Sequence, residues 1–164
     1  MDVEEIVNIS IQAYKDHYTH LWKDKGKRYL ETSFNYNAIS AYLRPSSLKK
    51  LYKIEIDGNL VGFLTLGFGY DESGDEDSHN MELERIYFIK EATGKGVGSK
   101  VVTFIQSIAR SGNHQNIWLK AMKKSPAVSF YKKHGWKIIN ETVLDHPEVI
   151  ADESEMYVMS KKLK

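Results

Sequence analysis

Hydrophobic and polar positions divide the chain into helical and extended segments. Apolar residues recur at helical spacing after Asp2 and again between Val97 and Ile108, whereas runs of strand character flank the turn Asp57-Gly58-Asn59. That turn predicts a β-hairpin. The expected elements, in chain order, are a helix from Val3 through Tyr14, a helix at Tyr36–Leu43, strands at Leu51–Ile56, Leu60–Tyr70 and Met81–Ile89, a helix from Val97 to near Gly112, a strand at Asn116–Met122, a helix at Ser125–His134, and strands at Trp136–Val143 and Glu155–Ser160.

Two stretches lack this periodicity. Residues 21–35 are polar and are expected to be irregular, and Asp71–Asn80 is expected to be an acidic loop. The acidic loop either steers a cationic acceptor or is a solvated connection. Because strands and helices are interleaved around a hairpin, we expect a mixed sheet in an α+β (mixed α/β) fold. A length of 164 residues predicts a single domain over residues 1–164.

The strand at Met81–Ile89 leads into a glycine-rich turn and the start of a helix, Thr93-Gly94-Lys95-Gly96-Val97-Gly98-Ser99-Lys100. Glycines permit close backbone approach and a helix start offers free N–H groups, so the segment indicates an anion site. A tight strand-to-helix connection is the alternative. The order Gly98-Ser99-Lys100 does not fit a P-loop, and the spacing of the glycines does not fit the dinucleotide-binding fingerprint.

A second segment, Phe130-Tyr131-Lys132-Lys133-His134-Gly135-Trp136, ends the helix that Ser125-Pro126 opens. Together with the glycine-rich turn, it resembles the GNAT-superfamily N-acetyltransferases, and in character the polyamine (spermidine/spermine) type. The resemblance implies a central mixed, largely antiparallel sheet, flanked by helices and splayed between two central strands. Family members usually have a short strand before the first helix. This chain begins almost at that helix, so we expect the edge strand to be missing or its edge to be covered otherwise.

The same resemblance implies acetyl-CoA as cosubstrate and no metal. The turn and helix start would bind the pyrophosphate, and the backbone of the preceding strand would hold the pantetheine arm and polarise the thioester carbonyl near Phe88. Lys95 and Lys100 would add charge or be solvated surface lysines. Thr93 and Lys124 stand where the family usually has Arg or Gln and Asn, respectively. The cofactor-binding residues expected on this basis are Ile86, Tyr87, Phe88, Gly94, Lys95, Gly96, Val97, Gly98, Ser99 and Lys124.

Acyl transfer to an amine needs a base for the ammonium and an acid for the leaving thiolate. Tyr131 stands where the family places the acid; alternatively it is a core aromatic of its helix. Glu82 and Glu84 are the candidate bases, since residues two apart on a strand share a face. Either one of them takes the proton, or both bind a cationic acceptor and water takes it. The alternative is a solvated strand face with Arg85 on the other side.

Composition narrows the function further. The chain has no cysteine, its net charge is +1, and its histidines show no metal-ligand spacing. No signal peptide or membrane-length apolar run is evident, so we expect a cytoplasmic location. The resemblance thus implies an acetyl-CoA-dependent N-acetyltransferase that acts by direct attack of a primary amine, with a small amine or polyamine favoured, no nucleic acid or membrane partner, and a homodimer as one assembly open to it. The alternatives are a non-catalytic CoA-binding sensor module and a protein N-terminal or lysine acetyltransferase. The aromatic residues of the first third, Tyr14, Tyr18, Trp22 and Tyr29, either line an acceptor pocket or pack in a core.

Overall fold

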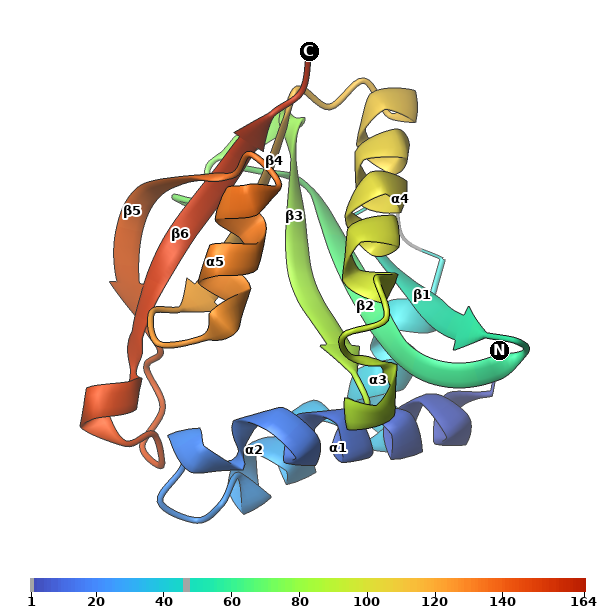
Figure 1. Cartoon of the computed structure of the whole chain (residues 1–164), viewed down its shortest axis with the longest axis vertical. Helices are drawn as coiled ribbons and strands as arrows, with labels where there is room; N and C mark the ends of the chain where they lie inside the picture. The colour runs from blue at the N-terminus through green and yellow to red at the C-terminus, as the bar shows by residue number, and fades with distance from the viewer. Residues whose placement is uncertain (1, 46–47) are drawn as a thin grey trace.

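The computed structural model describes residues 2–45 and 48–164, and helices cover both faces of its central sheet (Figure 1). The N-terminal helices precede the first strand, and the remaining helices alternate with later strands. The elements are α1 (Val3–Tyr18), η1 (Thr19–Leu21), α2 (Lys27–Ser33), α3 (Tyr36–Leu43), β1 (Lys49–Ile56), β2 (Asn59–Tyr70), β3 (Glu76–Phe88), η2 (Lys90–Ala92), α4 (Val97–Ser111), β4 (Asn116–Met122), α5 (Pro126–Lys133), β5 (Lys137–Val143), η3 (Ala151–Glu153) and β6 (Glu155–Lys162).

The six-stranded sheet has the order β1-β2-β3-β4-β6-β5. All neighbouring strands are antiparallel except β3 and β4, which are parallel. The β3–β4 pairing extends only as far as Glu82 and Trp118, although β3 continues to Phe88 and β4 to Met122. The sheet is therefore mixed, largely antiparallel and splayed between its central strands, which confirms the expected fold.

A β-bulge lies beside this opening. Thr65 of β2 pairs with Arg85, but the next residue, Leu66, pairs with Leu83, so Glu84 is an extra residue in β3. Arg85 consequently lies on the same face as Glu84, stacked against Phe34. The expectation that Arg85 points to the other side of the strand is wrong, because a bulge interrupts the alternation of side chains.

Two hydrophobic clusters lie on opposite faces of the sheet. On one face α4 and α5 cover a cluster that includes Leu64, Leu83 and Ile105. On the other face α1–α3 cover a cluster that includes Phe63 and Phe34. Phe63 and Leu64 are consecutive in β2 and belong to different clusters, as the alternation of a strand requires. Figure 1 shows α4 and α5 on either side of β3, with α1–α3 gathered toward the end of β3.

Several local signals have the expected structure. Asp57 and Gly58 turn the β1–β2 hairpin with positive φ angles of 50° and 77°. The Ser125 hydroxyl accepts a hydrogen bond from the Ala127 N–H and caps α5, which begins with Pro126. Gly135 follows the helix with φ +81°, a conformation that glycine adopts without strain.

The expectation of irregular structure over residues 21–35 is wrong, because α2 forms there. The Asp24 carboxylate accepts hydrogen bonds from the Gly26 and Arg28 N–H groups, both at 2.9 Å, and so fixes the start of the helix. Leu30 and Phe34 anchor this segment in the core. Because so few positions of this segment are buried, its polar sequence does not show the apolar spacing that would predict a helix.

The acidic segment Asp71–Asn80 is only partly a loop. β3 begins at Glu76, which pairs with Tyr70 of β2, so only the first half of the segment is a turn. That turn is organised by the Asp71 carboxylate, which accepts from the Ser73 and Asp75 N–H groups at 2.9 and 3.0 Å. Its position at the start of β3, away from Phe88, favours the solvated connection over a steering role.

The structure also bears on the short edge strand that family members usually have before the first helix. Over residues 2–45 no strand precedes β1, and β1 is the edge strand. No helix in the described ranges combines the length and the apolar character that crossing a membrane requires.

Candidate active site

The splay between β3 and β4 contains two adjacent cavities. The smaller has a volume of about 260 Å³ and the larger about 370 Å³. The residues that line both are Tyr18, Leu21, Ile86, Tyr87, Met122, Ser125 and Ala127. Because a wall is shared, a molecule bound in one cavity can contact a molecule bound in the other.

The glycine-rich turn leads into α4 beside the smaller cavity. Gly94 and Gly96 have φ angles of 74° and 75°, and Gly96 is the residue before the first turn of α4. No side chain of the described residues caps this helix start. The first N–H groups of a helix have no partner within it, and they carry the positive end of the helix dipole. The turn therefore offers a backbone site that fits the pyrophosphate of a CoA molecule.

The two sequence motifs are in direct contact. A Cβ atom on Gly98 would lie 3.1 Å from Cζ of Phe130, so the first turn of α4 packs against α5 because residue 98 has no side chain. Nearby, the Ser99 hydroxyl and His134 Nε2 are 3.0 Å apart and form a hydrogen bond. His134 ends α5, as expected for a structural residue at a helix C-terminus.

The lysines near the turn point to different surroundings. Lys95 and Lys100 are exposed and line a separate hollow between α4 and β1. Lys124 lines the smaller cavity and donates to the Glu153 carboxylate at 2.8 Å. Thr93, also in the wall of the smaller cavity, donates its hydroxyl proton to the Lys90 carbonyl. Of these four residues, only Thr93 and Lys124 therefore line the smaller cavity.

The end of β3 forms the opposite wall of the smaller cavity. Ile86, Tyr87 and Phe88 all line it, where β3 has no neighbouring strand on the β4 side. The Phe88 carbonyl accepts a hydrogen bond from His17 Nε2 at 3.1 Å. Backbone groups on an unpaired strand edge can bind an extended chain, which fits a pantetheine arm.

Tyr131 comes from α5 and lines the larger cavity. Its side chain is only 5% exposed and packs against Trp136, with ring centroids 5.3 Å apart. Burial raises the pKa of Tyr131 above its ordinary value of 10. The residue is thus both a core aromatic and a protonated phenol at the site, so the two interpretations of the sequence are compatible.

Glu82 and Glu84 lie against the same glycine of β2. A Cβ on Gly67 would lie 3.5 Å from one Glu84 oxygen and 3.6 Å from one Glu82 oxygen, so the side chains share a face as expected. Burial, with the neighbouring Glu84 charge as the second cause, raises the pKa of Glu82 to about 7. Glu84 lines the larger cavity, but Glu82 lines neither cavity.

Glu84 has one paired and one unpaired oxygen. Oε1 accepts a hydrogen bond from Lys49 Nζ at 2.6 Å. Oε2 is shielded from solvent and has no hydrogen-bond partner among the described residues. A buried carboxylate oxygen without a donor is unfavourable. The negative charge that Glu84 brings to the wall of the larger cavity is suited to attracting a cationic amine.

Tyrosines from the N-terminal helices form the far wall of the larger cavity. Tyr14, Tyr18 and Tyr29 line it and also pack against one another, with the Tyr14 ring centroid 5.0 Å from each of the others. Trp22 does not line the larger cavity; it is buried beneath these residues and donates from Nε1 to the Tyr14 hydroxyl at 3.0 Å. Three of the four aromatics therefore line a cavity, whereas Trp22 packs in the core.

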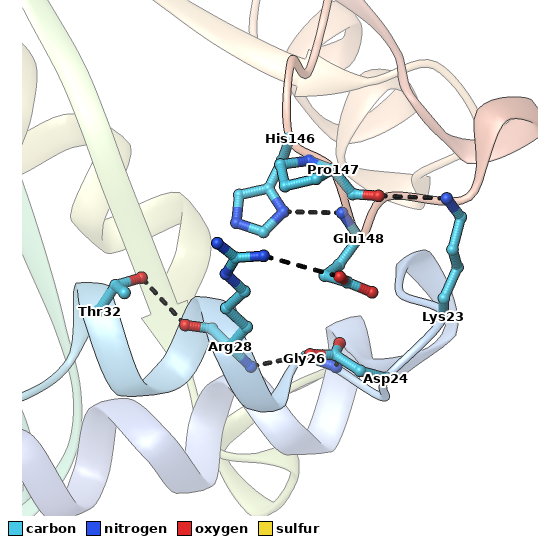
Figure 2. Close-up of polar contacts among 8 residues, drawn as sticks. All are labelled: Lys23, Asp24, Gly26, Arg28, Thr32, His146, Pro147 and Glu148. Atoms are coloured by element: carbon cyan, nitrogen blue, oxygen red, sulfur yellow. Dashed lines mark hydrogen bonds and ion pairs between the residues drawn. The ribbon is translucent and has the colours of Figure 1, made fainter.

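The connection between β5 and β6 lines the cavity on a further side, and Figure 2 shows polar contacts of this connection with Lys23 and Arg28. Val143, Leu144 and Asp145 line the larger cavity, and the residues after them bind the N-terminal helices. Two of the contacts are backbone hydrogen bonds, from Lys23 N to Glu148 O at 2.9 Å and from Ile150 N to Leu21 O at 2.8 Å. The other two involve side chains: Lys23 Nζ donates to Pro147 O at 3.1 Å, and Arg28 and Glu148 form an ion pair at 3.8 Å (Figure 2). We call residues 144–150 the closing segment. No sequence signal marked it, because its role depends on contacts with residues far away in the chain.

Known proteins are similar to this chain over most of its length. The model of the acetyltransferase (GNAT) family matches residues 9–136. A Lactobacillus delbrueckii subsp. lactis protein, described as an uncharacterized N-acetyltransferase in the pepI 3′ region, is 25% identical over 167 residues, which cover 98% of this chain and 91% of that protein.

Solved structures support the fold. The PaiA N-acetyltransferase from Thermoplasma acidophilum in complex with coenzyme A aligns with a TM-score of 0.75 and 20% identity over 99% of this chain and 93% of that one. Arabidopsis thaliana Naa50 in complex with a bisubstrate analogue aligns with a TM-score of 0.57 and 20% identity over 69% of this chain and 72% of that one.

Proposed function

Because the chain belongs to the acetyltransferase (GNAT) family, we propose that its larger cavity binds the primary amine of a small molecule as the acetyl acceptor. Family membership makes the chain an acetyl-CoA-dependent N-acetyltransferase. The observation that carries the choice of acceptor is the enclosure of the larger cavity by the closing segment. Its volume of about 370 Å³ falls in the small-molecule range of roughly 300–1,000 Å³.

Charge around the larger cavity favours a small amine over a polycation. The charged side chains that line it are two acids, Glu84 and Asp145, and two bases, Arg85 and Lys120. Glu84 is in addition paired with Lys49. A polyamine carries several positive charges and would be better matched by an excess of carboxylates. A protein substrate would need an open groove in place of the closing segment.

The residues that would hold acetyl-CoA are those of the smaller cavity and the glycine-rich turn. N–H groups from Gly94 to Ser99 are suited to the pyrophosphate, and the free edge of β3 at Ile86–Phe88 to the pantetheine arm. Lys124 lies in the same wall, with its charge engaged by Glu153. When bound, acetyl-CoA supplies an activated acetyl thioester.

Glu82 and Glu84 are suited to handling the amine. An alkylammonium has a pKa of about 10.4, so it must lose a proton before it can attack. Glu84 lines the larger cavity and is suited to attracting the acceptor ammonium, and Glu82, with a pKa of about 7, is suited to receiving the proton through water. The amine then attacks directly, since the chain has no cysteine to carry an acetyl group.

Tyr131 is suited to protonating the leaving thiolate. Its raised pKa keeps the phenol protonated throughout the physiological range, and it lines the cavity beside Ala127, which belongs to both cavities. The thiol has a pKa near ~8.5 by analogy with cysteine, below that of the phenol, so Tyr131 assists by hydrogen-bonding to the sulfur as negative charge develops on it, and any proton that it gives up is replaced from solvent.

Release of free thiol from acetyl-CoA, measured with a panel of amino acids, monoamines, polyamines, aminoglycosides and peptides, tests this proposal. We expect turnover with small amines and little with peptides. Turnover that requires a peptide or protein would overturn the small-molecule assignment. CoA binding without thiol release from any acceptor would instead indicate a CoA-binding sensor module.

A further inference from the structure

Arg85 is a cation in the wall of the larger cavity that the proposed chemistry does not use. The bulge at Glu84 turns it to the face of α1–α3. Its guanidinium carbon lies 5.2 Å from the Phe34 ring centroid and 5.5 Å from the Tyr42 ring centroid. Burial raises the pKa of the Tyr14 phenol, another residue of the cavity wall, and the charge of Arg85 is close enough to oppose that rise in part.

The guanidinium has few polar partners. Within the described residues it makes one hydrogen bond, from Nη1 to the Ser33 carbonyl at 3.5 Å, and no ion pair. A guanidinium has five N–H donors, and a largely buried one without a carboxylate partner is unfavourable. Most of its hydrogen-bonding capacity is therefore unused at the edge of a ligand cavity.

The charges around Arg85 leave its own charge uncompensated. The other groups that face it are the phenols of Tyr29, Tyr42 and Tyr87, which are neutral at physiological pH, and the carboxylate of Glu84. Glu84 already forms an ion pair with Lys49 at 2.6 Å, and within the described residues it forms none with Arg85. An anion from outside the chain is thus the missing partner.

We propose that Arg85 binds a carboxylate of the acceptor, so that the acceptor is an amino acid or a close analogue with a primary amine and a carboxylate on one small molecule. The inference rests on the proposed function and names the substrate class of the same cavity. The planar guanidinium matches a carboxylate through two parallel hydrogen bonds. Glu84 and Arg85 are consecutive and share a face, so their opposite charges match the two ends of a zwitterion.

The test compares acceptors that differ only in the carboxylate. Amino acids, their primary amides and their decarboxylated amines are assayed by thiol release with the wild type, Arg85→Gln and the control Arg110→Gln, which removes an exposed arginine of α4. We expect the wild type and the control to prefer the acids in kcat/KM by on the order of 100-fold. Arg85→Gln should lose this preference through a higher KM for the acids, so that the acids and the amides react with similar kcat/KM in this variant.

The rates with the amides show whether Arg85→Gln still folds and binds acetyl-CoA. A parallel loss with acids and amides, or a wild type that accepts amides and amines as well as acids, would overturn the proposal. Calorimetric titration of the amino acids into CoA-loaded protein separates the two proposals. Binding that is lost in Arg85→Gln without any turnover would retain the carboxylate site and reject the acetyl-transfer proposal. Absence of amino acid binding to the wild type would reject the carboxylate site.

Discussion

The two cavities of the splay are built from different parts of the chain. The smaller one is lined by the end of β3, by Thr93 and by the start of α5, and the glycine-rich turn after Thr93 offers the free backbone N–H groups at the start of α4. The larger one is lined by tyrosines and charged side chains from α1, α2, β3, β4, α5 and the segment after β5. The backbone site beside the smaller cavity depends on where glycine is present, and the larger cavity depends on which side chains are present.

This difference explains why the cosubstrate is easier to identify than the acceptor. A backbone site requires particular φ angles and the absence of Cβ atoms, so it leaves a spaced glycine pattern in one short segment. A side-chain site can be assembled from distant residues in many combinations. The predictions below change one cavity at a time, from the largest expected effect to the smallest.

Tyr131→Phe should lower kcat by roughly 10²–10⁴-fold, because it removes the proton donor for the thiolate. CoA affinity, measured by calorimetry, should change little, since the ring remains packed against Trp136. Tyr52→Phe removes a hydroxyl beside Phe104, outside both cavities, and serves as the control. Unchanged turnover in Tyr131→Phe would show that the phenol is only a core residue.

Glu82→Gln should lower kcat/KM at pH 8 by about 10- to 100-fold and remove an inflection near pH 7. The wild-type rate should rise as pH increases through about 7, since the base must be deprotonated. The pH profile of thiol release measures both effects. Glu55→Gln, an exposed position of β1, is the matched control, and an inflection that survives in Glu82→Gln would assign it to another group.

Glu82→Gln should also change stability in a pH-dependent way. The folded-state pKa of about 7 lies above the ordinary value of 4.5, so the carboxyl destabilises the fold progressively from about pH 4.5 and fully above pH 7. The variant should therefore be more stable than the wild type by about 1–2 kcal/mol at pH 8 and not at pH 4. Urea unfolding at the two pH values measures this, and equal differences at both would contradict the shifted pKa.

Gly96→Ala should weaken CoA binding by several-fold without a steric clash. No atom lies within 4 Å of a Cβ built there, so the cost arises from the φ angle of +75°, at about 1 kcal/mol. Gly58→Ala is matched to it, with φ +77° and equally open space in the β1–β2 turn. Both variants should lose similar stability, and a comparable loss of CoA affinity in Gly58→Ala would show that the turn has no special role.

Glu148→Gln should have the smallest effect, within about twofold on the acceptor KM. The Arg28–Glu148 pair is 3.8 Å long and exposed, and such pairs contribute little. The backbone hydrogen bonds of the closing segment remain. Acceptor KM at low and high salt measures the effect, and a large salt-sensitive rise would mean that this ion pair holds the cavity closed.

Sequence patterns predicted most elements and singled out several residues that line the two cavities, but not how the larger cavity is assembled. The hairpin turn at Asp57-Gly58 and the cap at Ser125 are local signals and have the expected structure. The bulge at Glu84 has no such signal, because it is defined by the register of β3 against β2. The side of Arg85, the Lys49–Glu84 pair and the closing segment depend on tertiary packing and were not predictable from one sequence.

The closing segment also has a consequence for the order in which the protein assembles. It joins Leu21 to Ile150 and Lys23 to Glu148, and so links regions near the two ends of the chain. Contacts of such large sequence separation carry the greatest loop-closure entropy and tend to form late and open early. The glycine-rich turn and α4 are contiguous, and the contact of Ser99 with His134 spans only 35 residues. Partial unfolding should thus abolish acceptor binding first, and leave a chain that still binds coenzyme A.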